Sequence, residues 1–221
     1  MSALVIVGAG DHGRVMADVA RSLGRELTGF VEPGRRPEGG SGTVAGLPIL
    51  GFLDDSVSSV PELAGEVEYV VAIGSNRERE RVFGRCAELG WRATSLVHPS
   101  GLLLGGADVR AGAQVCAASI IGLDATVGMN AIVNTAAGID HDCRIGDHAF
   151  IGPGVRLAGR VNVETGAHVG IGAVVREGCT IGAWAYVAAG AVVVHDVAAG
   201  VRVAGVPARP MERPVPEEEN G

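Results

Sequence analysis

Residues 115–139 read VCAASIIGLDATVGMNAIVNTAAGI, and an aliphatic residue returns at every sixth position of this stretch. The same period holds outward in both directions, from Val97 to Val193, and the residue four places after each aliphatic position is small or compact. Three such hexads of short strand and turn close a triangular coil of 18 residues. The sequence therefore predicts a parallel β-helix of about six coils, with the aliphatic column inside. The period alone leaves the handedness open.

Other features of the repeat support this fold and restrict the alternatives. A long helix would need a period near 3.6 and fewer glycines and prolines. Gly122, Gly128 and Gly146 each follow an aliphatic position, where we expect the chain to turn. A rod of this kind can also be a structural spacer or a self-assembly module, so the repeat does not by itself establish an enzyme.

The first 96 residues follow a different pattern. Ala3–Val7 is a short apolar run, and glycines at positions 8, 10 and 13 then give the spacing GxGxxG before a helical stretch from residue 14 to 23. Further elements are expected at residues 27–31 and 67–73 (strands), 33–46 (a loop) and 77–89 (a helix). Strand, glycine turn, helix and strand resemble half of a doubly wound nucleotide-binding sheet. The turn would offer backbone N–H groups to a pyrophosphate, and the alternative is a tight turn in a small α/β domain.

Composition excludes several classes of function. The chain has 221 residues, 47% of them hydrophobic, and its net charge of −7 argues against a nucleic-acid partner. All basic residues are arginine, so Schiff-base enzymes, P-loop kinases and dehydrogenases with a Tyr and Lys pair are excluded. The four cysteines lack metal-ligand spacing, so no metal is expected. The apolar start is too short for a signal sequence, and we expect a cytoplasmic protein without a membrane partner.

One histidine has the surroundings of a catalytic base. His141 precedes Asp142 where the chain leaves the inner column for a corner, and Gly159 lies 18 residues later, one coil above. Coils stack at about 4.8 Å, so the Gly159 N–H lies within reach of a reacting group on which His141 acts. These are the parts of a general base and an oxyanion site. His195 occupies the same column about 14 Å away and cannot share that site.

Several segments together resemble a known family. Residues 134–146 are similar to the catalytic segment of bacterial sugar acyltransferases of the sialic acid O-acetyltransferase and nucleotide-sugar N-acetyltransferase type. Residues 8–13 and 72–76 resemble the two nucleotide-sugar loops of that family, and residues 205–209 resemble the closing motif of hexapeptide-repeat acyltransferases. The resemblance implies a left-handed β-helix, a homotrimer with its active site between subunits, and acetyl-CoA bound between neighbouring rods. It implies an α/β Rossmann-like half domain (1–96), a β-helix (97–205) and a C-terminal tail (206–221).

The resemblance also implies residue roles. His141 would be the general base, Asp142 would orient it, and the Gly159 N–H would bind the oxyanion. The residues implied in substrate binding are Gly10, Asp11, His12, Gly13, Glu32, Gly74, Ser75 and Asn76. The residues implied in acetyl-CoA binding are Ile171, Gly172, Ala189, Pro207 and Arg209. Phe150 stands where the family often has histidine, so no CoA contact is carried over to that position.

The expected activity is N-acetylation, by acetyl-CoA, of the 4-amino group of a nucleotide-linked 4-amino-4,6-dideoxysugar. The resemblance points to GDP as the nucleotide and to a surface polysaccharide such as an O-antigen as the destination. Two alternatives stay open: O-acetylation of sialic acid or another sugar, and a non-enzymatic assembly module. The glycine turn with Glu32 favours a nucleotide-linked substrate, since a free sugar has no pyrophosphate to hold.

Overall fold

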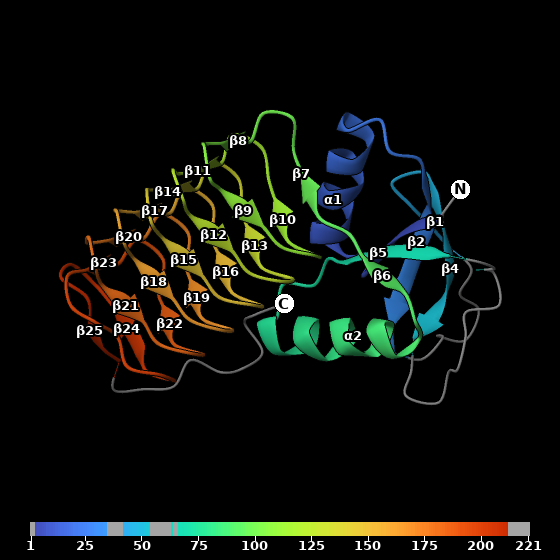
Figure 1. Cartoon of the computed structure of the whole chain (residues 1–221). Coiled ribbons are helices and arrows are strands. Elements are labelled where there is room, and N and C mark those ends of the chain that lie inside the picture. The colour runs from blue at the N-terminus through green and yellow to red at the C-terminus, as the bar shows by residue number, and fades with distance from the viewer. Residues whose placement is uncertain (1–2, 35–41, 54–62, 64–65, 212–221) are drawn as a thin grey trace.

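The computed structural model describes residues 3–34, 42–53, 63 and 66–211. A small α/β part stands beside a rod of stacked coils (Figure 1). This is the predicted order of a Rossmann-like half domain followed by a parallel β-helix. The boundaries 1–96, 97–205 and 206–221 stay a prediction, and most of the last segment lies outside the described residues. Neither helix of the described part combines the length and the apolar character that a membrane span requires.

The α/β part is built on a six-stranded sheet of order β3-β4-β2-β1-β5-β6. Its strands are β1 (Ala3–Val7), β2 (Leu27–Pro33), β3 (Thr43–Val44), β4 (Leu47–Leu53), β5 (Val67–Val71) and β6 (Arg92–Ala93). All neighbours are parallel except β3 and β4. Because side chains alternate along β1, Leu4 packs with Met16 of α1 (Asp11–Ser22) and Val5 with Val82 of α2 (Asn76–Glu88). One helix therefore covers each face of the sheet.

Two expectations for this part need correction. The loop expected over residues 33–46 contains β3, whose Val44 pairs with Leu47 of β4, a strand the sequence analysis did not predict. Helix α1 begins at Asp11 rather than residue 14, because Gly10 serves as its N-cap. Gly10 accepts the first helical hydrogen bond from Arg14, at 3.1 Å. The glycine turn and the helix are thus one continuous structure.

The rod has three faces, each a parallel sheet. The first face consists of β7 (Leu96–Val97), β10 (Gln114–Val115), β13 (Ile132–Val133), β16 (Phe150–Ile151), β19 (His168–Val169), β22 (Tyr186–Val187) and β24 (Arg202–Ala204), with β25 (Arg209–Pro210) antiparallel at its end. The second face consists of β8 (Leu102–Leu103), β11 (Ile120–Ile121), β14 (Gly138–Ile139), β17 (Arg156–Leu157), β20 (Val174–Val175) and β23 (Val192–Val193). The third face consists of β9 (Asp108–Val109), β12 (Thr126–Val127), β15 (Arg144–Ile145), β18 (Asn162–Val163) and β21 (Thr180–Ile181). The second face counts six strands, one for each coil, as the period predicted.

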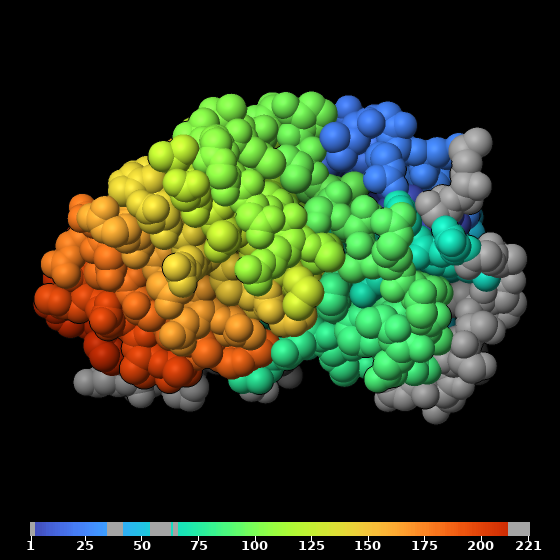
Figure 2. Space-filling view, viewed as in Figure 1, coloured from blue at the N-terminus to red at the C-terminus, as the bar shows by residue number. Residues whose placement is uncertain are grey.

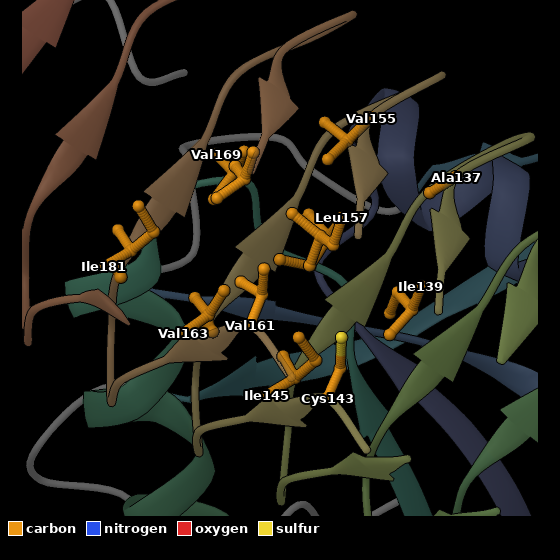
Figure 3. Packing of buried hydrophobic residues seen from close by; sticks show 14 of the residues in the cluster. Ala137, Ile139, Cys143, Ile145, Val155, Leu157, Val161, Val163, Val169 and Ile181 are labelled. Carbon is orange, nitrogen blue, oxygen red and sulfur yellow. The ribbon is translucent and has the colours of Figure 1, made fainter. Parts of the chain in front are cut away.

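The interior of the rod is the predicted double column of aliphatic and small side chains. Figure 3 shows Ile139, Ile145 and Val163 directed into the same interior as Cys143 and Val161. All four cysteines of the chain are free and buried, as expected for core residues. The column is incomplete at its start, where Leu103 is 41% exposed because β8 is an edge strand with one neighbour.

The glycines after the aliphatic positions have a different role from the one expected. Gly122, Gly146 and Gly170 do not have positive φ; a Cβ at these positions would lie 2.5–2.7 Å from the backbone of the next coil. They are needed because adjacent coils approach closely, not because the chain turns there. The left-handed turns fall two residues later, at residues as different as Asp142 and Trp184.

A buried arginine joins the two parts of the molecule. Arg79 of α2 is fully buried and donates to the carbonyl oxygens of Asn130 (3.0 Å) and His148 (2.7 Å) in the rod. It also donates to the carbonyl of Ile73, at 2.9 Å, in the α/β part. These bonds fix α2 against the first face, and the two parts form one continuous surface in the view of Figure 2.

Candidate active site

His141 and Asp142 lie at the corner between the second and third faces, after β14 and before β15. The Nδ1 atom of His141 is 2.7 Å from Oδ2 of Asp142, and the His141 backbone N–H donates to Asp140 at 2.7 Å. Because Asp142 accepts from Nδ1–H, Nε2 is the ring nitrogen left as a hydrogen-bond acceptor. The sequence prediction that these two side chains meet is confirmed by this distance.

The Nε2 side of the imidazole lies over Gly159, at the same corner one coil later. A Cβ built on Gly159 would lie 2.5 Å from Nε2 of His141 and 2.6 Å from Cε1. The backbone carbonyl of His141 accepts from the Arg160 N–H at 2.9 Å, while the Gly159 N–H has no hydrogen-bond acceptor among the described residues. Glycine therefore makes room for the ring and leaves a backbone donor beside it.

This corner is open rather than enclosed. The side chain of His141 is 44% exposed and that of Asp142 is 54% exposed. The Cys143 side chain points into the rod, where its thiol donates to the Ala158 carbonyl at 3.2 Å and burial raises its pKa. The imidazole and carboxylate thus face solvent, and the neighbouring thiol is withdrawn from it.

The glycine loop of the α/β part forms the tight turn that the spacing predicted. Gly8 has φ +103, and a Cβ on Gly13 would collide with the Gly8 carbonyl oxygen. Within this loop the Asp11 side chain is almost fully exposed and pairs with Arg14 at 3.3 Å. Burial raises the pKa of Glu32, the residue near the end of β2, while a hydrogen bond from the Ala9 backbone opposes that rise.

His12 is turned toward the rod rather than toward solvent. Its Nε2 atom lies 2.9 Å from Oε1 of Gln114, whose amide nitrogen donates to the Val71 carbonyl at 2.8 Å. Burial lowers the pKa of His12 to about 4, and the charge of Arg79 adds to the effect. His12 is therefore a neutral link between α1 and the rod.

The second loop lies at the start of α2 against later coils of the rod. The Ser75 hydroxyl caps the helix by accepting from the Glu78 N–H at 3.5 Å. The Asn76 side chain donates to the carbonyls of Gly166 (3.0 Å) and Ala167 (3.2 Å) and accepts from Arg79 at 2.8 Å. The Asn76 amide is thus fully used within the fold, while Gly74 and Ser75 line an open groove.

The residues expected to bind acetyl-CoA lie at two other places on the rod. Ile171, Gly172 and Ala189 occupy the corner between the first and second faces, where the Gly190 N–H donates to Ile171 at 2.8 Å. Pro207 precedes β25 at the end of the rod. Arg209 borders a cavity of about 480 Å³ at that end. One chain therefore does not bring these residues to His141, because the second face separates the two corners.

The role of Arg79 at the junction of the two parts has no signal in the sequence. An arginine within a helix carries no spacing signal, and its partners, Asn130 and His148, are more than 50 residues away in the chain. Within the described part of the chain, no group of three His, Cys, Asp or Glu side chains is arranged to hold a metal ion.

Comparison with known proteins identifies the family. Residues 3–86 match the model of the PglD N-terminal domain. The chain is 30% identical over 148 residues to GDP-perosamine N-acetyltransferase of Escherichia coli O157:H7, which covers 65% of this chain and 67% of that protein. The chain belongs to the hexapeptide-repeat nucleotide-sugar acetyltransferases.

The fold of this acetyltransferase family extends over almost the whole chain. The crystal structure of the H141N mutant of perosamine N-acetyltransferase from Caulobacter crescentus, in complex with CoA and GDP-perosamine, superimposes with a TM-score of 0.87 at 34% identity. The match covers 96% of this chain and 98% of that one. A different curated relative, an acyl-[acyl-carrier-protein]–UDP-N-acetylglucosamine O-acyltransferase of Aliivibrio fischeri (strain MJ11), is 36% identical over 85 residues. The chain spans only 32% of the length of that relative.

Proposed function

We propose that this protein transfers the acetyl group of acetyl-CoA to the 4-amino group of a nucleotide-linked 4-amino-4,6-dideoxysugar, with GDP-perosamine as the first candidate. The observation that carries the proposal is the His141 imidazole, held by Asp142 at 2.7 Å with its free nitrogen over Gly159. A spacer or assembly module has no need of such a group at an open corner. The relatives from Escherichia coli and Caulobacter crescentus support the choice of sugar and nucleotide.

The proposed reaction is a direct transfer without an acyl-enzyme. The neutral N4 of the sugar attacks the thioester carbonyl carbon, and Nε2 of His141 accepts the proton that N4 loses as the C–N bond forms. The tetrahedral intermediate collapses with cleavage of the C–S bond, and the His141 imidazolium returns its proton to the departing CoA thiolate. Asp142 stabilises the imidazolium formed between these two steps.

The backbone of Gly159 would stabilise the oxyanion of that intermediate. Its N–H is free of hydrogen-bond acceptors among the described residues and lies beside the imidazole. A fixed donor of this kind lowers the barrier because it needs no reorganisation when the charge develops.

Completion of the site requires a second copy of the chain. The base lies at the corner between the second and third faces, whereas the residues implied in acetyl-CoA binding lie at the corner between the first and second. If the second faces of neighbouring rods pack around a threefold axis, the His141 corner of one rod meets the acetyl-CoA corner of its neighbour across each interface. The proposed assembly is therefore a homotrimer with acetyl-CoA between subunits.

The second face has the composition such an interface needs. Its outward row carries Leu102, Ile120, Val174 and Val192, with Arg156 as the charged member, and the first three are more than 40% exposed in the single chain. The outward row of the third face is polar, with Thr126, Arg144 and Asn162. An apolar stripe along one face of a rod indicates contact with a partner.

O-acetylation is the second candidate, because a curated relative of this chain is an O-acyltransferase. The same base and oxyanion donor would serve a sugar hydroxyl. Release of CoA thiol by the purified protein, with amino sugars and sialic acid as acceptors, distinguishes the two. Turnover with a nucleotide-linked 4-amino sugar supports N-acetylation, and turnover only with a sugar hydroxyl contradicts it.

A further inference from the structure

A groove of about 680 Å³ lies between the start of α2 and the later coils of the first face. Ser75 and Arg77 contribute from the α2 side, and His168, Tyr186 and Arg202 contribute from the rod. We call it the arginine groove. Gly10, Asp11, His12 and Glu32 do not line it. Gly74, Ser75 and Asn76, which the resemblance implies in substrate binding, do line it, so the groove includes the second nucleotide-sugar loop but neither the glycine loop nor the corner that carries His141.

On the rod side of the groove, His168, Tyr186 and Arg202 belong to a stack of flat groups that begins at Phe150, outside the groove. The rings of Phe150 and His168 are stacked at 4.6 Å, and those of His168 and Tyr186 at 4.8 Å. The guanidinium of Arg202 lies over Tyr186 at 4.2 Å, and that of Arg77 lies over Trp184 at 4.4 Å. The stack arises because residues 18 apart occupy the same outward position on successive coils.

These two arginines have no anionic partner in the described part of the chain. Neither guanidinium makes an ion pair or a side-chain hydrogen bond there, and Nε of Arg202 is buried without an acceptor. A guanidinium stacked on a ring keeps its planar edge of N–H donors directed away from the ring. Two preoriented forks, one from each wall, thus border a single groove.

The charge balance of the groove is positive in a protein of net charge −7. Glu78 is the one acidic residue among the described residues that line it, against the two guanidinium groups of Arg77 and Arg202. Arg79 lies buried behind the same loop and spends its donors on backbone carbonyls and on the Asn76 side chain, with no carboxylate. Its charge is therefore not neutralised locally.

We propose that the arginine groove binds the diphosphate of a nucleotide. This rests on the proposed function, which uses two substrates with a nucleoside diphosphate, namely the nucleotide sugar and CoA. Paired guanidinium groups match phosphate oxygens in bidentate geometry, and the ring edges provide an apolar floor beside them. The groove thus adds Arg77 and Arg202 to the residues that hold one of the substrates.

Binding measurements on the full chain test this without any need for turnover. Isothermal titration with GDP, UDP and dTDP measures affinity for the nucleotide part of a nucleotide sugar. Titration with 3′-phospho-ADP measures affinity for the nucleotide part of CoA. Arg77→Met and Arg202→Met keep the alkyl stem and remove the charge. Each should lower the affinity for one of these two kinds of nucleotide roughly 10- to 100-fold. Arg110→Ala is the matched control, because this arginine pairs with Asp108 on the third face.

Two further readouts separate the groove from a general structural effect. Glu78→Gln removes the acidic residue of the groove and should tighten the same nucleotide, a direction that loss of structure cannot produce. The chain has two tryptophans, so Trp91→Phe leaves Trp184 as the reporter, and its fluorescence should change on binding. Addition of the affected nucleotide should protect this signal from iodide quenching.

The outcomes distinguish this proposal from the proposed function. If amino-sugar turnover is observed but both arginine variants bind every nucleotide as the wild type does, the groove proposal is overturned and the enzyme assignment stands. If no acceptor is acetylated but the variants lose nucleotide affinity, the groove stands and the enzyme assignment fails. Binding of a synthetic acidic peptide in place of every nucleotide would also overturn the proposal.

Discussion

Nε2 of His141 lies 2.5 Å from the point where a Cβ of residue 159 would be, so the imidazole can hold its position only above a glycine. Gly159 has no positive φ that would demand glycine on its own. The requirement therefore comes from the ring, and it couples the candidate base to the candidate oxyanion donor.

Gly159→Ala should displace the imidazole without unfolding the rod. A misplacement of about 1 Å costs on the order of 100-fold in rate, and we expect a loss of at least that size in kcat. Gly105→Ala is the control, since it occupies the same corner position and its Cβ would meet only Leu123, at an ordinary 3.5 Å. Equal activity of the two variants would contradict the coupling.

His141→Asn should lower kcat by roughly 100- to 10,000-fold, because it removes the proton acceptor. Asp142→Asn should cost less, since the imidazole remains and only its orientation and the support for its positive charge are lost. His195→Asn, at the same corner position three coils later, should leave kcat unchanged. Steady-state thiol release for the three variants measures this order, and a wild-type rate for His141→Asn would exclude the base assignment.

Val174→Glu should separate the subunits by placing a charge on the apolar row of the second face. The expected result is a monomer by light scattering at micromolar concentration, with loss of acetyl transfer because both corners are then incomplete. Thr126→Glu places the same charge on the polar third face and should leave assembly intact. An active monomer would show that a single chain carries the whole site.

The pH dependence of stability should depend on His168. Burial lowers the pKa of His168 to about 4 from its ordinary 6.5, with the charges of Arg79 and Arg202 adding to the effect. The unfolded chain binds this proton near pH 6.5 and the folded chain only near pH 4, so stability falls as the pH falls between these values. At 1.36 kcal/mol per pKa unit, His168 lowers the free energy of unfolding by about 3 kcal/mol once the pH is below both values.

His168→Phe keeps a ring between Phe150 and Tyr186 and removes the titration. Urea unfolding at a series of pH values should then show a shallower loss of stability below pH 6.5 than in the wild type. A residual slope is expected because burial also lowers the pKa of His12 to about 4. Identical slopes in wild type and variant would contradict the assigned role of His168.

The sequence was sufficient to predict those features that depend on a local repeat. The period of six specifies the rod because every aliphatic residue from Val115 onward meets its equivalent 18 residues away. The pairing of His141 with Asp142 follows from adjacent residues at one corner. The apolar row of the second face could have been found from the same period, because Leu102, Ile120 and Val174 are separated by multiples of 18 residues.

Features that depend on how the α/β part packs against the rod were not predictable from a repeat. The arginine groove joins Arg77 to Trp184, which are more than 100 residues apart, and no spacing rule connects them. The contact of the His12 ring with Gln114 lies across the same junction and has no signal in the sequence, while the substrate role of His12 stays a prediction. The role of Gly122 was misassigned because a glycine needed for close backbone approach and one needed for turning look alike in a sequence.

The most direct test of the central claim is thiol release from acetyl-CoA by the purified protein. The acceptors are 4-amino-4,6-dideoxysugars linked to GDP, UDP and dTDP, with free sialic acid for comparison. We expect rapid turnover with the GDP-linked amino sugar and loss of that turnover in His141→Asn. Turnover only with free sialic acid, or none with any acceptor, would contradict it.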